Sequence, residues 1–293
     1  VAGVPGPLTA DDAAEFLLRD QYLVLEDNDQ RIDALEALAE TTFERLTTGD
    51  LPGPRRVADV LGPVVEAGHI QAYAVDEDQQ RFFERLGLDG GLRPVEGDSL
   101  AVVVNNAVGN KVDLFLQREV AYEVAWDPAT GALETTATVT LTNDAPSAGL
   151  PDYVIGSALP PGERPPAGTN RTYLSVYSPW ELEGARLDGE PVELERQREA
   201  GRYTYSLYLD VPPEGGTRTV ELDLAGALPP GAGYALDVAS QPLVRPDRWS
   251  LAVAVAGDDE ITATDGLAVE GRTVRRAGAL TARYTDYRIE VDR

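Results

Sequence analysis

Two arginines near the start of the chain are the residues best suited to bind an anion. Arg19 ends the apolar stretch 16–19, and Arg31 lies in the acidic stretch 27–33. A guanidinium group binds phosphate oxygens through paired N–H donors and offsets their charge. Arg19 and Arg31 are therefore candidate phosphate ligands. The alternative is two surface arginines that pair with nearby carboxylates, which contributes little to stability.

An acidic cluster near the C-terminus has the oxygen ligands that calcium prefers. Asp258, Asp259 and Asp265 lie within one short span, together with Glu260. Their spacing does not match that of an EF-hand loop, so the pattern favours a solvated acidic turn over a Ca²⁺ site. Calcium is the one cofactor that we keep as a candidate.

Three residues of the region with strand-like periodicity are candidate ligand contacts. Lys111, the only lysine, follows a stretch rich in Asn and Gly at 105–110, a composition typical of a structural turn. Tyr173 and Tyr208 belong to a group of aromatic residues on which a sugar ring could stack if they share an exposed face. At strand spacing, the alternative is that these aromatic residues form core and cross-strand pairs.

The residue counts exclude several kinds of active site. The chain has no cysteine, so disulfides, thiolate nucleophiles and Cys-ligated zinc are impossible. His69 is the only histidine, and its position just after Gly68 favours a role at a helix C-terminus over that of a catalytic base. We find no glycine-rich phosphate loop and no Gly-x-Ser-x-Gly motif. We therefore predict no catalytic residue, and the pattern favours a chain that is not an enzyme.

The charge of the chain is strongly negative. Among 293 residues, 25 are Lys or Arg and 50 are Asp or Glu, which gives a net charge of −25. This charge opposes binding to nucleic acid and to anionic lipid surfaces. Residues 1–90 contain 7 basic and 19 acidic residues, a net charge of −12. A solvated helical face explains this excess, and a face that binds a cation or a basic partner is the sharper alternative.

Helical periodicity covers residues 8–90. We predict helices that begin at Thr9, near Asp29, near Pro54 and at Asp76, where capping residues or a first-turn proline precede apolar residues at spacings of three and four. In the second helix this stripe ends before Gly49 and consists of Ile32, Leu35, Leu38, Ala39, Phe43 and Leu46. In the fourth we expect Phe82, Phe83 and Leu86 to face inward.

From about residue 97 the side chains alternate with a period of two. A strand over 112–126 and a return strand after the turn 127–131 predict a hairpin, and 203–211 with 217–225 predict a second one. At least seven short strands with this spacing predict an immunoglobulin-like β-sandwich. The fold class is thus α+β and multidomain. Residues 1–92 are the helical region, expected to be the C-terminal part of a larger α/β domain, and 93–293 are the sandwich.

Four stretches resemble the C-terminal half of actinobacterial proteins that contain the "domain of unknown function 4012". They lie at 8–18, 105–113, 150–154 and 170–179, in that order. The resemblance implies a longer parent protein with an N-terminal membrane anchor and an extracytoplasmic body in the cell envelope. It implies no reaction. The lack of a methionine, even at position 1, also predicts a processed or truncated piece of a longer protein.

The N-terminal helices also resemble those of LytR-CpsA-Psr phosphotransferases, which transfer cell-wall glycopolymers from polyprenyl pyrophosphate. The resemblance places Arg19 and Arg31 where two arginines of that family bind pyrophosphate. The stretch 27–33 around Arg31 departs from the family pattern because it lacks the glutamines that follow the second arginine in that family, and Asp33 lies there instead.

Together these observations predict a non-catalytic, extracytoplasmic module that binds envelope glycan or a protein partner. It would bind no nucleic acid, and this segment contains no run of about 18 apolar residues with which to insert into a membrane. The alternatives are a fragment of a glycopolymer phosphotransferase that uses Arg19 and Arg31, and a structural spacer. A binding module should expose an aromatic or apolar patch on its sandwich.

Overall fold

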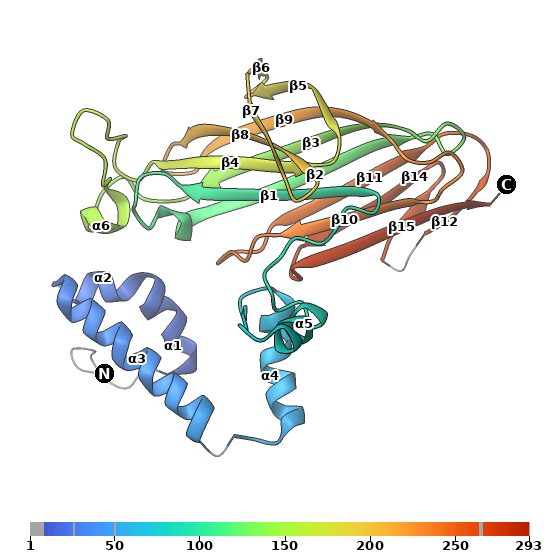
Figure 1. Ribbon diagram of the computed structural model, residues 1–293. Coiled ribbons are helices and arrows are strands. Elements are labelled where there is room, and N and C mark those ends of the chain that lie inside the picture. Colours follow the sequence, from blue (N-terminus) through green and yellow to red (C-terminus); the bar gives the residue numbers. More distant parts are fainter. Residues whose placement is uncertain (1–8, 26, 50, 264–265, 293) are drawn as a thin grey trace.

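The computed structural model describes residues 9–25, 27–49, 51–263 and 266–292. A helical segment comes first, and two packed β-sheets follow from Asp98 to Asp292 (Figure 1). The predicted change from helical to alternating periodicity near residue 97 is confirmed.

The helices begin where local capping signals predict. The side chains of Thr9, Asp27 and Asp76 each accept a backbone N–H at a helix start, Pro54 occupies the first turn of its helix, and Gly49 is a C-cap. The helices are α1 (Ala10–Glu15), a π-helical turn (Phe16–Asp20), α2 (Gln21–Val24), α3 (Asn28–Thr48), α4 (Pro54–Glu66) and α5 (Glu77–Arg85). None of the helices in the described ranges combines the length and apolarity needed to cross a membrane.

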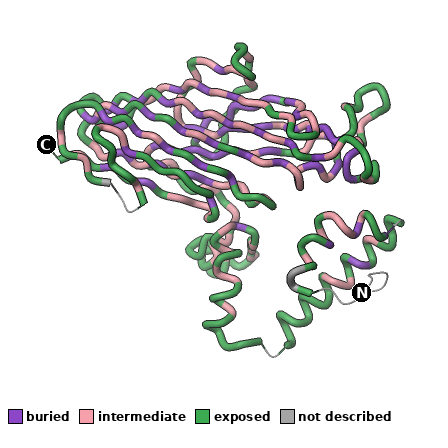
Figure 2. The backbone as a smooth tube through the Cα atoms, turned by 180° about the vertical axis from the view of Figure 1, so that it is seen from behind, coloured by how far each residue is buried: buried purple, intermediate pink, exposed green. Residues whose placement is uncertain are grey.

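Most apolar side chains of the helical segment remain in contact with solvent. Among its described residues, the buried apolar cluster consists of Phe16, Leu25 and Ala34. Phe82 and Leu86 are each 51% exposed, so the prediction that they face inward is wrong. Periodicity shows that apolar residues share one face of a helix, but it does not show that another element covers that face. Figure 2 shows α3 and α4 as largely exposed.

The helical segment contacts the sandwich at two separate places. Near α6 (Asp152–Ile155), the ring of Tyr22 stacks on that of Tyr153, with centroids 5.1 Å apart. At the end of α4, the Glu66 carbonyl accepts the backbone N–H of Arg283 at 2.7 Å. The hydroxyl of Tyr284 donates to the carbonyl of Gly91 in the linking segment.

The two sheets have seven and eight strands. In spatial order, the first sheet contains β12 (Glu260–Ala263), β15 (Tyr284–Asp292), β10 (Tyr234–Ser240), β1 (Asp98–Asn106), β4 (Asn170–Ser178), β8 (Arg202–Val211) and β7 (Glu195–Glu199). The second contains β13 (Ala268–Glu270), β14 (Thr273–Ala279), β11 (Arg248–Val255), β2 (Leu116–Trp126), β3 (Ala132–Asn143), β9 (Gly216–Ala227), β5 (Glu181–Leu187) and β6 (Glu190–Pro191).

One of the two predicted hairpins is present. Strands β2 and β3 pair antiparallel from Leu116↔Asn143 to Trp126↔Leu133, which confirms the first hairpin, although residues 112–115 form a 3-10 turn instead of a strand. The second is wrong, because β8 pairs with β4 in the first sheet and β9 pairs with β3 in the second. Alternation identifies strands, but the short connection between β8 and β9 passes from one sheet to the other.

Alternate side chains of both sheets fill the space between them. Part of the core is aromatic and consists of four side chains that are each at most 3% exposed, namely Tyr122, Trp126, Tyr234 and Trp249. Rings of Trp126 and Tyr234, from different sheets, lie 5.8 Å apart. Burial of such large apolar surfaces stabilises the packing of one sheet on the other.

A glycine in β9 makes room for Trp180. A Cβ atom at Gly226 would lie 2.1 Å from Cε3 of the Trp180 ring. We expect Gly226→Ala to lower the free energy of unfolding by about 1–3 kcal/mol, because the indole must move. The control is Gly184→Ala on the neighbouring strand β5, where the nearest atom is 3.8 Å away. Equal urea midpoints for the two variants would contradict the close approach.

Candidate functional site

Two of the predicted ligand contacts lie side by side on the outer face of the first sheet. Tyr173 of β4 is directly opposite Tyr208 of β8 in the antiparallel ladder. Their ring centroids are 4.6 Å apart, and Tyr208 is 63% exposed. The alternation of each strand places both side chains away from the core, so the sheet register itself builds this aromatic pair.

Hydrogen bonds hold two tyrosine rings across the same face. The hydroxyl of Tyr173 donates to Glu195 at 2.7 Å, and that of Tyr177 donates to Glu199 at 2.9 Å. Both glutamates are on β7, and β8 lies between β7 and β4. Since neighbouring strands are about 4.8 Å apart, each ring must lie over β8 to reach its glutamate.

Small residues lie on the outer face where the rings cross it. Ser175, Thr204 and Ser206 are each at most 7% exposed, although they point away from the core. The hydroxyls of Ser175 and Ser206 are 2.8 Å apart and hydrogen-bond to each other. Short side chains at these positions allow the aromatic rings to lie close to the sheet. We call Tyr173, Tyr177 and Tyr208 the tyrosine platform.

The hydroxyls of Tyr173 and Tyr177 keep their protons at neutral pH. Burial, followed by the hydrogen bond to Glu199, raises the pKa of Tyr177 to about 12. The hydrogen bond to Glu195 is the main cause of the raised pKa of Tyr173. Both groups are therefore donors that orient rings, and neither is suited to proton transfer near neutral pH.

An open hollow of about 630 Å³ adjoins the exposed ring of Tyr208. Arg171 and Asp210, which form a two-point ion pair across β4 and β8, are part of its lining. Arg171 Nε donates to Asp210 Oδ1 at 2.7 Å, and a terminal guanidinium nitrogen donates to Oδ2 at 2.8 Å. The hollow thus combines an aromatic surface with charged donors and acceptors, as small-molecule sites commonly do.

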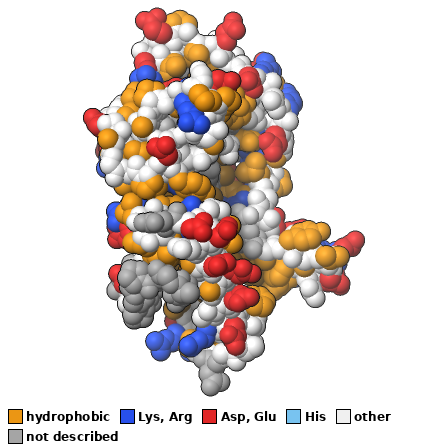
Figure 3. All heavy atoms as spheres, turned by 90° about the vertical axis from the view of Figure 1, so that its left-hand side faces the viewer, with side chains coloured by type: hydrophobic (Ala, Val, Ile, Leu, Met, Phe, Trp, Pro, Cys, Tyr) orange, Lys and Arg blue, Asp and Glu red, His pale blue; other side chains and the backbone are white. Residues whose placement is uncertain are grey.

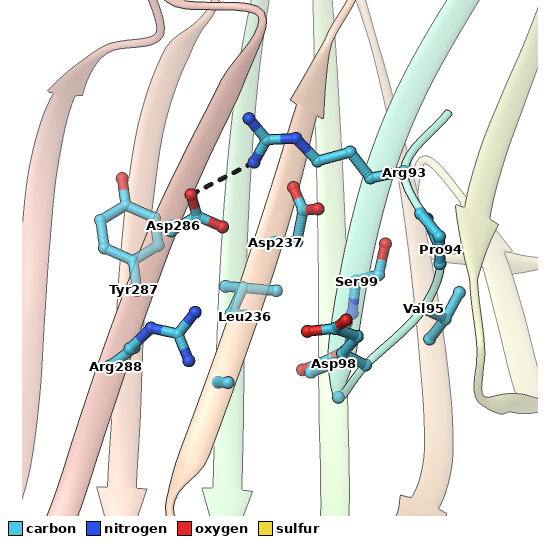
Figure 4. A pocket seen from close by; sticks show the side chains of 13 residues that line it. Arg93, Pro94, Val95, Asp98, Ser99, Leu236, Asp237, Asp286, Tyr287 and Arg288 are labelled. Atoms are coloured by element: carbon cyan, nitrogen blue, oxygen red, sulfur yellow. Dashed lines mark hydrogen bonds and ion pairs between the residues drawn. The ribbon is translucent and has the colours of Figure 1, made fainter. Parts of the chain in front are cut away.

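A second cavity, of about 310 Å³, lies where the segment 93–97 crosses the same sheet (Figure 4). Arg93 contacts Asp286 at 3.3 Å, and Asp237 lies beside this pair. Asp237 Oδ1 is buried and has no hydrogen-bond partner. Burial is the main cause of the raised pKa of Asp237, and Asp286 raises it further. These contacts attach the segment that enters β1 to β15.

The two candidate phosphate ligands have separate partners. Arg19 pairs with Glu15 and Asp20, and its Nε lies 2.8 Å from Asp20 Oδ1. The Arg31 guanidinium carbon is 5.8 Å from the ring centroid of Tyr22 and 5.4 Å from that of Tyr153. Among the described pockets, none is lined by both arginines.

Lys111 lies with Arg31 at the contact between the helices and the sandwich. Its Nζ is 6.0 Å from the ring centroid of Tyr22 and 5.7 Å from that of Tyr153. Cations over aromatic faces stabilise such contacts modestly. The structure therefore brings Arg31 and Lys111 together where the helical segment contacts the sandwich, although no sequence pattern connects them.

The calcium candidates can be placed only in part. Asp258 and Asp259 lie in the turn between β11 and β12, and Asp265 lies outside the described residues. Within the described ranges, no group of three or more His, Cys, Asp or Glu residues could hold a metal ion. His69 is exposed beyond the end of α4, where its backbone N–H donates to the Val64 carbonyl at 3.0 Å.

Sequence reasoning missed the glutamates that hold the platform. Glu195 and Glu199 belong to β7, a strand whose residues are all exposed and whose sequence is Glu-Arg-Gln-Arg-Glu. Nothing in that pattern indicates which carboxylates meet tyrosines, since the strand pairing that joins them is not local. Tyr177, in contrast, lies four residues after Tyr173, a spacing that places both side chains on the same face of a strand.

Comparisons with known proteins give no family for this chain. No family model matches it, and no curated protein matches it. Among solved structures it is similar to a proposed nutrient-binding protein from Legionella pneumophila, with 8% identity, a TM-score of 0.43, and coverage of 66% of this chain and 71% of that one. It is also similar to an M1 zinc metallopeptidase from Deinococcus radiodurans, with 14% identity, a TM-score of 0.32, and coverage of 62% and 43%. For yeast LTA4 hydrolase in complex with bestatin, the values are 10%, 0.35, 60% and 29%. The chain thus spans less than half the length of either enzyme.

Proposed function

We propose that this chain is a non-catalytic module that binds glycan on the tyrosine platform. The observation that carries the proposal is the pair Tyr173–Tyr208, an aromatic surface that is exposed yet ordered by its own strand register. The faces of sugar rings that carry C–H groups are apolar and pack on aromatic rings. Arg171 and Asp210 next to Tyr208 supply donors and acceptors for sugar hydroxyls.

The shape of the surface favours a chain of sugars over a compact ligand. The platform and its hollow lie on an open sheet face, and the rings of Tyr173 and Tyr177 follow one another along β4. Tyr173 and Tyr177 are four residues apart on this strand, so their Cα atoms are about 13 Å apart, and Ser175 occupies the outward position between them. An extended envelope polysaccharide, the kind of ligand that the sequence resemblance implies, is long enough to contact both positions, whereas a single sugar is not.

We expect Tyr208→Ala to weaken binding of soluble peptidoglycan glycan strands by about tenfold or more, because exposed aromatic anchors dominate such contacts. The measurement is isothermal titration calorimetry with the full chain. Since Tyr208 is exposed, the variant should keep its thermal midpoint. The matched control is Tyr73→Ala, which removes a tyrosine that is 80% exposed in the helical segment.

Two results would reject the proposal. One is wild-type chain that shows no heat of binding with these strands or with a panel of cell-wall polysaccharides. The other is equal loss of affinity in Tyr73→Ala and Tyr208→Ala, which would mean that exposed tyrosines contribute nonspecifically.

A further inference from the structure

The outer face of α3 presents an apolar stripe to solvent. Ile32, Leu35, Phe43 and Leu46 are 52%, 38%, 69% and 50% exposed. With Ala39 they recur at spacings of three and four, so they share one side of a helix that has about 3.6 residues per turn. Ala34, the only buried residue of α3, lies on the opposite side and packs with Phe16 and Leu25. The stripe therefore points away from the rest of the helical segment.

Five carboxylates form a second stripe directly beside the first. Asp29, Asp33, Glu36, Glu40 and Glu44 also recur at spacings of three and four. The centre of this acidic stripe is about 100° around the helix axis from that of the apolar one. Among the described residues, no arginine or lysine forms an ion pair with any of the five. Figure 3 shows acidic and apolar side chains exposed together on the side of the molecule that it views.

This combination is unusual for a solvated helix. Single exposed apolar residues need no explanation, but a continuous stripe over four turns indicates a surface that binds something. An uncompensated acidic stripe along one edge raises the local negative potential and attracts cationic partners. The two stripes run parallel over the same length of α3, so a single partner helix could contact both.

We propose that α3 is a docking surface for a basic amphipathic helix of another protein. The partner would place its leucine-type side chains on Ile32, Leu35, Phe43 and Leu46 and its Lys or Arg side chains along the acidic stripe. This mode, in which an apolar helix face meets a groove or stripe and flanking charges set the orientation, is a common form of helix recognition. It is independent of glycan binding on the tyrosine platform.

Charge argues against two other occupants. A second copy of α3 would bring its own acidic stripe, and like charges repel across a shared interface. An anionic membrane surface would repel the same five carboxylates. Both occupants would bury the apolar stripe, but only a basic helix satisfies both stripes at once.

The experiment titrates the full chain with a fluorescent 18-residue peptide that has a leucine stripe flanked by lysines, and follows anisotropy. We expect Phe43→Ser with Leu46→Ser to weaken binding at least about tenfold. Glu36→Gln, Glu40→Gln and Glu44→Gln together should weaken it to a similar extent and reduce its dependence on salt. Both sets of positions are exposed, and circular dichroism should show that α3 remains helical.

The control variants test whether the peptide binds nonspecifically to any exposed apolar side chain or to any negatively charged surface. Val60→Ser removes an apolar side chain that is 63% exposed on α4. Glu123→Gln, Glu134→Gln and Glu183→Gln remove three charges from exposed positions on the second sheet. Both controls should bind the peptide as the wild type does.

Three results would overturn the proposal. A matched peptide with glutamates in place of the lysines could bind equally well, or the two control variants could lose as much affinity as the α3 variants. The third is a dimer in analytical ultracentrifugation that Phe43→Ser with Leu46→Ser dissociates, which would assign the stripe to self-association.

Discussion

Arg118→Ala is expected to lower the free energy of unfolding by about 3–5 kcal/mol, the usual cost of removing one partner of a buried ion pair. The side chains of Arg118 and Asp247 are 1% and 5% exposed. Arg118 Nε and a terminal nitrogen donate to the two carboxylate oxygens at 2.7 and 2.6 Å. Without the guanidinium, the carboxylate of Asp247 stays buried with no cation.

Removal of the Arg118 side chain should also weaken the contact between the two sheets. Arg118 of β2 donates to Gln241 at 3.0 Å, and Gln241 exchanges two hydrogen bonds of 2.9 Å with the backbone of Val104 in β1. Arg118 therefore links the second sheet to the first through one amide side chain. Equilibrium urea denaturation measures the cost, and hydrogen exchange at Val104 should speed up in the variant.

A surface pair that joins β11 to β2 provides the control. Arg248 of β11 lies 2.7 Å from Glu119 of β2, with side chains 70% and 52% exposed. Arg248→Ala should cost less than about 1 kcal/mol, since water screens the pair. The double variant Arg118→Met with Asp247→Leu should be more stable than Arg118→Ala, because it leaves no buried charge. If Arg118→Ala and Arg248→Ala lower the free energy of unfolding equally, burial does not make the Arg118–Asp247 pair more important for stability than the surface pair.

The features that could be predicted from the sequence are those that depend on residues close together along the chain. Thr9, Pro54 and Asp76 mark helix starts because capping depends on the next two or three residues alone, and the hairpin of β2 and β3 depends on one tight turn. Alternation likewise identifies Tyr173 and Tyr208 as strand residues. Their pairing across β4 and β8 needs the sheet order, which no local signal contains.

Buried charged residues show the limit of what alternation along a strand can predict. Arg118 stands between Leu116 and Val120 at an inward position of β2, and such an interruption of alternation is the one signal that a buried charge leaves in the sequence. The sequence cannot identify its partner, because Asp247 is 129 residues away. The same holds for α3, whose stripe is evident from the sequence, whereas its exposure depends on which elements pack against it.

Asp98 is another buried charged residue, and it accepts hydrogen bonds from both sheets. The hydroxyls of Tyr122 in β2 and Tyr234 in β10 lie 3.0 and 2.8 Å from its Oδ2. Trp180 Nε1 and the backbone N–H of Ser99 donate to Oδ1 at 2.6 and 2.7 Å. Asp98 is 2% exposed. Burial is the main influence on this carboxyl and raises its pKa to about 6, while the four donors oppose the increase.

We expect the difference in stability between wild type and Asp98→Asn to grow as the pH falls from 7 to 4. The folded protein holds this proton more tightly than the unfolded chain, whose carboxyl has a pKa of 3.8. The wild type therefore gains stability on acidification through pH 6, by about 3 kcal/mol in all, and the amide of the variant has no such titration. At pH 7 the variant should already be less stable by about 1–3 kcal/mol, because an amide oxygen cannot accept from all four donors.

Urea midpoints of both proteins at several pH values measure this dependence, and Asp127→Asn serves as the control. Asp127 is a turn carboxylate whose pKa is lowered by hydrogen bonds from Thr130 and the backbone N–H of Ala129. Because the pKa of Asp127 is lowered, its carboxylate loses its stabilising contribution as the pH falls. The difference in the free energy of unfolding between wild type and Asp127→Asn should therefore become smaller on acidification. If the difference in stability between wild type and Asp98→Asn also becomes smaller on acidification, the four hydrogen-bond donors affect the pKa of Asp98 more than burial does. In that case the carboxylate stays ionised in the core, because Tyr122, Tyr234 and Trp180 replace the water that it has lost.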